Sequence, residues 1–216
     1  MVVSGIEIQR VIPIVDIFGG EDGVKVWDMR TRSELAPPTQ GQGIRGPVTC
    51  TMWIPQRDTT KYILCYGTVL GYLAFWRLGE QRRFEELFAR RVGTGAEITS
   101  MACDSSSLDK ISIVLATRER VVQVYWFDSH AQLHAVFSVQ LGSTVPKSVT
   151  FVDNAAKDIY VFGYYNGFMC VFLYCLMAKS NSLISHILRG DNGKIISTQE
   201  TGKLMYVCAL FIGNRY

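Results

Sequence analysis

The chain has 216 residues, of which 48% are hydrophobic and 12% aromatic, so it carries enough apolar material for a sizeable core and is too apolar for a disordered chain. Its net charge is +3 with 19% charged residues. That balance gives no support to a nucleic-acid-binding protein or a protein held on a membrane surface by charge.

The first clear element is a pair of short strands with a tight turn between them. Residues 1–11 are apolar and ambiguous, but Ile14–Phe18 is a β-branched and aromatic run followed by the turn residues 19–22. The strand Val24–Trp27 comes next and ends in a Trp-Asp pair. An outer strand is expected at 34–38, where two prolines fit a sheet edge because proline donates no ladder hydrogen bond.

Weaker copies of this pattern recur along the chain. Three segments align with Val24–Trp27, namely Tyr72–Phe75, Val122–Tyr125 and Phe168–Val171. The last residues of the four copies are spaced by 48, 50 and 46 residues. A short strand precedes each copy, at 14–18, 62–66, 111–115 and 159–162. Inner strands entered from glycine-containing turns are expected at 48–53, 98–102, 145–151 and 204–210.

This period, with four strands in each unit, predicts an all-β fold, a β-propeller of four-stranded blades. The expected repeats are 1–42, 43–92, 93–141 and 142–202, with the start of a further blade at 203–216. Four to five repeats are few for a propeller, so we expect one that is incomplete or unusually small. Either the final strand closes a four-bladed ring with the first repeat, or the ring is open with two exposed sheet edges.

The repeats resemble the WD40 family of β-propellers, although the motifs are degenerate. Trp27-Asp28 is a literal Trp-Asp pair, and Phe75-Trp76 and Tyr125-Trp126 stand in the corresponding places. The Gly-His pair that usually opens a WD40 repeat is missing, so blade packing should depend on apolar strand faces. The resemblance implies a protein-interaction scaffold without catalytic activity or cofactor, whose partners are other proteins.

Two motif searches address enzymatic alternatives. Residues 41–46 match the letters of a dinucleotide-binding GxGxxG, but they form a loop between prolines that feeds a strand rather than a helix. No nucleophile elbow, phosphate loop or paired-carboxylate motif is present. An enzymatic propeller remains an alternative, with the loop carboxylates Asp22, Glu97 and Asp153 as its candidates for a channel site.

A basic segment at 77–91 is the candidate partner-binding surface. Its members are Arg77, Arg82, Arg83, Arg90 and Arg91. Glu80, Glu85 and Glu86 are interleaved with them, so a solvated outer strand with no binding role is the alternative.

The cysteines favour a reducing compartment, and the histidines give no support to a zinc site. The six cysteines stand at 50, 65, 103, 170, 175 and 208, mostly in expected strands and without a CxxC pair, which favours buried free thiols. The histidines have no ligand partners at zinc spacing. We expect an intracellular protein, cytoplasmic or nuclear.

The segment 159–178 admits three interpretations. It carries no formally charged residue from end to end, and it is long enough for a single-pass membrane span. Helix, if present anywhere, is expected at 174–188. Alternatively, Cys170–Ser185 is an in-frame insertion, such as translated intron sequence, whose removal places Ile187 at the Trp27 position.

Overall fold

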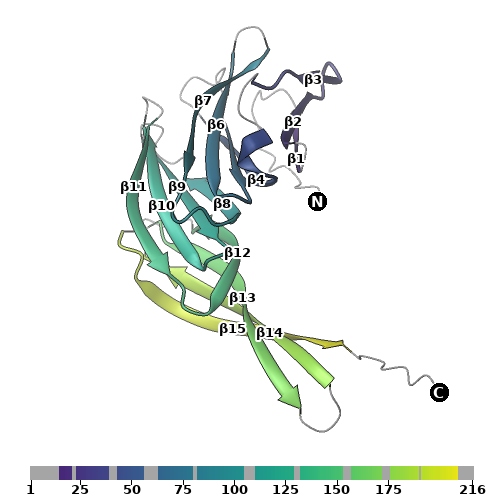
Figure 1. Cartoon of the computed structure of the whole chain (residues 1–216). Helices are drawn as coiled ribbons and strands as arrows, with labels where there is room; N and C mark the ends of the chain where they lie inside the picture. The colour runs from purple at the N-terminus through teal and green to yellow at the C-terminus, as the bar shows by residue number, and fades with distance from the viewer. Residues whose placement is uncertain are drawn as a thin grey trace, which may run out of the picture.

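The computed structural model of the chain consists of four antiparallel β-sheets (Figure 1). It describes residues 15–20, 23–38, 43–55, 63–79, 82–104, 110–128, 132–152, 157–171, 176–189 and 191–208. The first sheet contains β1 (Val15–Gly20), β2 (Gly23–Asp28) and β3 (Ser33–Leu35). The second contains β4 (Val48–Ile54), β5 (Ile63–Thr68), β6 (Tyr72–Leu78) and β7 (Phe84–Arg91). The third contains β8 (Ile98–Asp104), β9 (Lys110–Thr117), β10 (Val121–Asp128) and β11 (Leu133–Gln140), and the fourth β12 (Thr144–Phe151), β13 (Ile159–Val171), β14 (Leu176–Leu188) and β15 (Ile195–Cys208).

The strands of each sheet follow one another in chain order, which is the arrangement of a propeller blade. Figure 1 shows the sheets along an arc, with the first and fourth sheets at its two ends. The all-β fold class is confirmed, and the four sheets form a partial β-propeller. The apolar residues 1–11 lie outside the described part of the chain.

The C-terminal part differs from expectation in two respects. Residues 204–208, expected to begin a further blade, continue β15 and pair with β14. Residues 176–188, where helix was expected if present anywhere, form strand β14. Among the residues that the structure describes, no helix is long and apolar enough to cross a membrane.

Strand register corrects the alignment of the repeats. The fifth residue of β2, β6 and β10 is Trp27, Trp76 and Tyr125, respectively. A register shift against the outer strand falls immediately before Trp76, Tyr125 and Leu188. Leu188 is therefore the fourth member of the series, rather than Ile187 or Val171, and Trp76 rather than Phe75 is the second.

The hairpin of the fourth sheet is much longer than the others. Leu64 pairs with Trp76 in the hairpin of β5 and β6, and the equivalent pair in the hairpin of β13 and β14 is Ile159 with Leu188. Strands β13 and β14 have 13 residues each, whereas β5 has 6 and β6 has 7. Figure 1 shows β13, β14 and β15 extending beyond the rest of the arc. Cys170–Ser185 falls within this extension, and its origin as an insertion remains a prediction.

Apolar side chains join each sheet to the next, as expected from the missing Gly-His pairs. Val24 and Val26 of the first sheet pack with Leu64 and Trp76 of the second. The third sheet packs against the fourth through a cluster that includes Val124.

The joint between the second and third sheets is aromatic. Phe75 of β6 stacks on Phe88 of β7 at 4.5 Å between ring centroids and on Phe127 of β10 at 5.1 Å. The core is therefore a series of joints between sheets rather than a single central cluster.

Candidate interaction surface

Antiparallel pairing gathers five chain segments at one end of the sheets. The start of β4 pairs with the end of β5, and the start of β6 with the end of β7, so the segments that join these ends lie together. We call this end the turn face. The turn face comprises the five segments that join or flank the strands of the second and third sheets at this end, namely 43–47, 69–71, 92–97, 118–120 and 141–143.

Backbone hydrogen bonds tie the segments of the turn face to one another. Val69 donates to the carbonyl of Pro47 at 2.9 Å, and Val92 donates to that of Gly71 at 2.9 Å. Arg118 and Leu141 make equivalent bonds, to the carbonyls of Glu97 and Arg120, at 2.9 and 2.8 Å. Each hairpin turn is thus bonded to the loop beside it, so the face has a defined shape.

Glycine is required where two segments of the turn face approach most closely. Gly71 has a φ of 73°, and a Cβ placed on it would lie 2.5 Å from the carbonyl carbon of Gly95. A side chain at Gly71 would therefore collide with backbone, which moves less readily than a flexible side chain.

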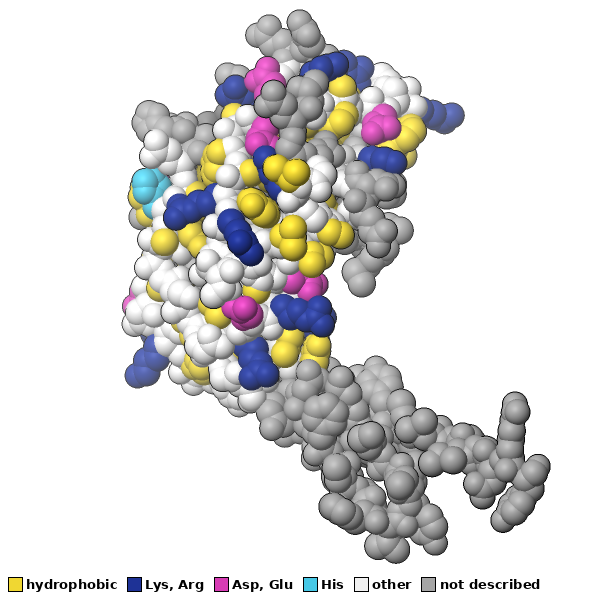
Figure 2. Space-filling model, viewed as in Figure 1, with side chains coloured by type: hydrophobic (Ala, Val, Ile, Leu, Met, Phe, Trp, Pro, Cys, Tyr) yellow, Lys and Arg dark blue, Asp and Glu magenta, His cyan; other side chains and the backbone are white. Residues whose placement is uncertain are grey.

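Exposed apolar side chains stand on the turn face beside these turns. The 3-10 turn Gly43–Arg45 presents Ile44, which is 79% exposed, and the β5–β6 turn presents Val69 and Leu70, 38% and 44% exposed. Leu70 lies over Gly46, where a Cβ would come within 2.8 Å of its Cγ. Figure 2 shows hydrophobic side chains gathered among basic ones over the middle of the molecule. We call Ile44, Pro47, Val69 and Leu70 the apolar patch.

A partly buried ion pair holds the segment that carries Ile44. Arg45 Nη2 donates to Glu86 at 2.7 Å, Nη1 bonds the other carboxylate oxygen, and Nη1 also donates to the Tyr66 hydroxyl at 3.3 Å. The hydrogen bond to Glu86 raises the pKa of Arg45, so the guanidinium stays charged. With Arg45 anchored inward, the neighbouring Ile44 projects outward.

Charged side chains lie next to the apolar patch along the turn face. Arg118 pairs with Glu97 at 2.8 Å, and Arg120 donates to the carbonyl of Gly142 at 3.1 Å. Glu97 was a candidate channel carboxylate, and in the structure it serves this exposed ion pair. Asp22 and Asp153 lie outside the described residues.

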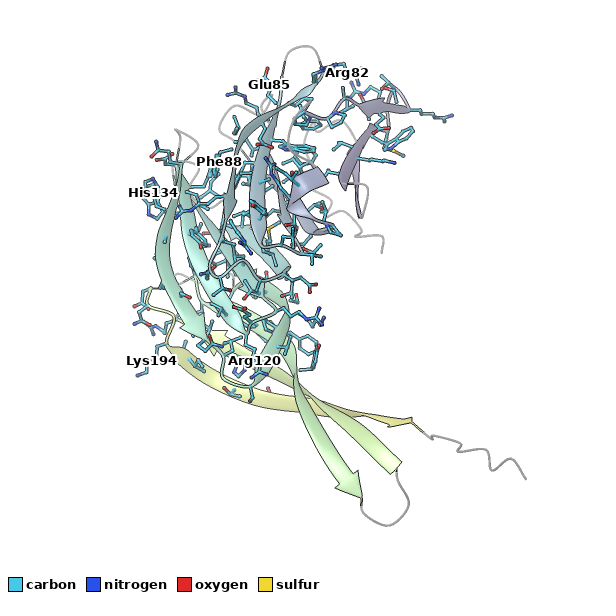
Figure 3. All side chains as sticks on the ribbon, in the orientation of Figure 1. Arg82, Glu85, Phe88, Arg120, His134 and Lys194 are labelled. Carbon is cyan, nitrogen blue, oxygen red and sulfur yellow. The ribbon has the colours of Figure 1, made fainter. Side chains whose placement is uncertain are left out.

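The five candidate arginines do not form one surface. Arg91 lies at the turn face, where its Nε donates to the carbonyl of Leu70 at 3.3 Å. The side chain of Arg90 reaches the third sheet instead, where its Nη1 donates at 3.5 Å to the carbonyl of Leu133 at the start of β11. Arg77, Arg82 and Arg83 lie at the opposite end of the second sheet, where Arg77 pairs with Glu85 at 3.4 Å. Figure 3 shows Arg82 and Glu85 at that end of the sheet.

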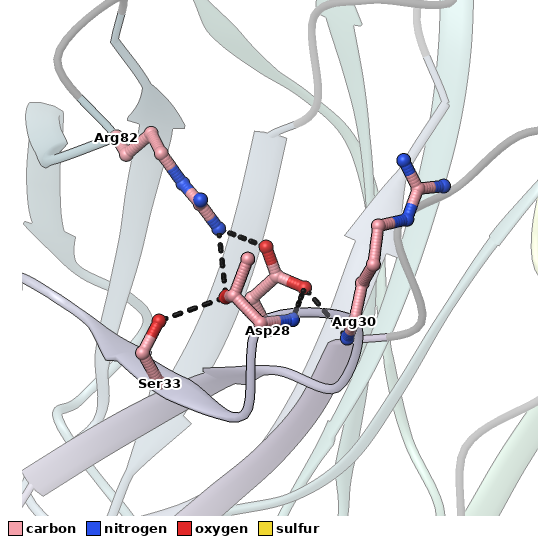
Figure 4. Close-up of polar contacts among 5 residues, drawn as sticks. Asp28, Arg30, Ser33 and Arg82 are labelled. Atoms are coloured by element: carbon pink, nitrogen blue, oxygen red, sulfur yellow. Dashed lines mark hydrogen bonds and ion pairs between the residues drawn. The ribbon is translucent and has the colours of Figure 1, made fainter.

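Arg82 joins the first two sheets through the Trp-Asp pair. Its guanidinium bonds the buried carboxylate of Asp28 and donates to the Thr31 hydroxyl at 3.2 Å (Figure 4). The same carboxylate accepts the backbone N–H of Arg30 at 2.8 Å, which closes the turn after β2. Asp28 is therefore a structural turn residue here.

The residues that stand in the Trp-Asp places of the later repeats pack within and between the sheets. Phe75, Trp76 and Tyr125 are buried in the joints between sheets. Trp126 is half-buried and stacks on His134 at 3.9 Å between ring centroids, with His134 Nε2 at 3.1 Å from Asp128.

Cysteine and histidine side chains form no metal site in the described part of the chain. Cys50, Cys65 and Cys103 are free thiols, and burial raises the pKa of Cys50 to about 12 and of Cys103 to about 11. Buried thiols with such pKa values are poor nucleophiles at neutral pH. His186 is bonded within the fourth sheet, to Thr144 at 2.9 Å and to Thr198 at 2.8 Å.

The apolar patch is the feature that the sequence analysis missed. Its signal was available, because Val69-Leu70 places two apolar residues in the turn between two expected strands, where polar residues are usual. The GxGxxG letters at 41–46 end in this patch, and Gly43–Arg45 is a single 3-10 turn leading to β4.

Comparisons with known proteins agree with the architecture. Neither a protein-family model nor a curated protein matches the sequence. The structure is similar to the WD40 domain of Toxoplasma gondii coronin, with a TM-score of 0.54 and 18% sequence identity over 90% of this chain. The match covers 49% of that chain, so the present chain spans about half its length. The WD40-type propeller fold is thereby confirmed, in partial form.

Proposed function

We propose that the chain is a non-catalytic protein-interaction scaffold that binds a protein partner on the apolar patch of the turn face. The fold supports the scaffold role by analogy, since WD40-type domains generally bind proteins and propeller folds also carry other activities. The observation that carries the proposal is the exposure of Ile44 and Leu70, 79% and 44%, on segments that hydrogen bonds hold in place. Exposed apolar side chains grouped on a fixed surface are typical of binding sites.

The charged rim fits the same role. Arg118 and Glu97 flank the apolar patch in an exposed ion pair, as expected for a polar rim around an apolar centre. The proposed setting is an intracellular reducing compartment, which the free thiols of Cys50, Cys65 and Cys103 support.

The test is affinity capture from cell extract with matched variants of the whole chain. Leu70→Glu and Ile44→Glu should each lose the captured partner, because a carboxylate in the centre of an apolar interface is left without a partner. Val136→Glu is the control, since Val136 is also exposed, at 48%, but lies on β11 away from the turns. A partner retained by all three variants contradicts the site. Turnover of a small substrate without a protein partner would instead support an enzymatic propeller.

A further inference from the structure

The two ends of the arc expose sheet faces that are covered everywhere else in the molecule. The fifth residue of β6 and of β10, Trp76 and Tyr125, and the equivalent Leu188 of β14 are exposed by 0%, 5% and 0%. Each is buried against the preceding sheet: Trp76 against the first, Tyr125 against the second and Leu188 against the third. Trp27 occupies the same position in the first sheet and is 38% exposed.

The other face of each sheet, which points toward the following sheet, is likewise covered except at one end of the arc. The residue before each of these positions packs against the following sheet, and Val26, Phe75 and Val124 are exposed by 2%, 0% and 4%. Ile187 is the equivalent residue of the fourth sheet and is only half-buried, as is Tyr160, which pairs with it across the sheet.

These positions define two complementary surfaces. In each sheet we call the face that points toward the preceding sheet the leading face, and the face that points toward the following sheet the trailing face. The first sheet has no preceding sheet, so its leading face carries the exposed Trp27. The fourth sheet has no following sheet among those described, and its trailing face carries Tyr160 and Ile187. At every internal joint a trailing face covers a leading face. The surface best suited to Trp27 is therefore the trailing face of another blade, and this chain carries such a face, half-buried at Tyr160 and Ile187.

We propose that two copies of the chain close into one ring, with the leading face of each copy packed against the trailing face of the other. The packing inside the chain supports a second copy, because at every internal joint the residue at the Trp27 position shares one cluster with the residue at the Ile187 position of the neighbouring sheet. Two copies supply eight sheets, within the range of about four to eight blades that propellers use. A two-fold rotation makes both joints equivalent and leaves neither face exposed. This proposal concerns a different surface from the turn face and does not rest on the proposed function.

The first experiment measures the mass of the unaltered chain in solution by sedimentation and light scattering over a range of concentrations. The expected particle has twice the 24.3 kDa of the chain and dissociates on dilution. A monomer at the highest soluble concentration overturns the proposal. Open polymers of increasing length also overturn it, because they mean that the rotation does not close after two copies.

The second experiment assigns the faces. Trp27→Glu and Ile187→Glu should each raise the dissociation constant of the dimer on the order of a hundredfold, because each leaves an unpaired carboxylate in both joints. Val136→Glu changes an exposed apolar residue outside both faces and should leave the constant unchanged. Circular dichroism and thermal melting of each variant establish that the chain still folds.

Mixing the two variants distinguishes this ring from a symmetric contact between like faces. In the mixture one joint unites an unaltered leading face with an unaltered trailing face, so part of the dimer should return. A dimer that only one of the two substitutions weakens overturns the proposal, since it means that one kind of face meets itself. A dimer that neither substitution weakens overturns it as well.

Discussion

Replacing Phe75 by alanine tests whether stacked aromatic rings hold neighbouring sheets together. Phe75 is fully buried, and its ring stacks on Phe88 and Phe127 at centroid distances of 4.5 and 5.1 Å. Truncation of such a buried ring leaves a cavity and costs about 3–5 kcal/mol of unfolding free energy. Since each kcal/mol shifts the melting temperature of a chain of this size by roughly 2–4 °C, the expected loss is roughly 6–20 °C.

Urea unfolding followed by circular dichroism measures this loss. Phe75→Leu is the matched variant, because it keeps most of the apolar volume and should cost less than half as much. Val136→Ala, at an exposed site, should change the free energy by less than about 0.5 kcal/mol. A cost for Phe75→Ala below about 1 kcal/mol would show that this joint is not tightly packed and would refute the account of how the sheets associate.

Three further predictions concern single features of the chain. Gly71→Ala should lower the melting temperature, because the new Cβ would lie 2.5 Å from the backbone of Gly95. Gly142→Ala should lower it less, because a Cβ there meets nothing within 4 Å and the only cost is the strain of a positive φ. Burial lowers the pKa of His186 in the folded chain, so the unfolded chain binds a proton more readily than the folded chain does. The stability that neutral His186 contributes to the folded chain is therefore complete above the ordinary histidine pKa of about 6.5, and it is lost as the pH falls through the lower pKa of the folded chain. Unfolding titrations from neutral to acidic pH should therefore show a loss that His186→Gln lacks. Deletion of Cys170–Ser185 should raise solubility and melting temperature, because it brings Ile159 and Leu188 nearly as close in sequence as their equivalents Leu64 and Trp76; a lower melting temperature would mark the segment as a structural element.

Local patterns along the chain were sufficient to predict the strands. Runs such as Ile111–Leu115 and Val122–Tyr125, separated by turn residues, gave the existence and order of β9 and β10, since strand and turn signals depend on a few adjacent residues. Their recurrence every 46 to 50 residues gave the four-stranded unit and the likeness to WD40 propellers. The all-β fold followed from the sequence alone, whereas the sequence left open whether the ring is incomplete or closes with four blades.

Register and side-chain grouping depended on contacts between distant segments. A shift of one residue moves every side chain to the other face of a sheet, and only pairing with the outer strand showed that Trp76 and Leu188 share the Tyr125 position. The arginines at 77–91 are close in sequence, yet β6, the turn after it and β7 carry them to opposite ends of the sheet. Conversely, Ile44 precedes β4 and Leu70 follows β5, and the segments that carry them lie side by side because Val69 bonds to Pro47 and Leu70 lies over Gly46. The sequence by itself determined the strands and their repetition, which are local, whereas the tertiary structure decided which faces are covered, since burial depends on the neighbouring sheet.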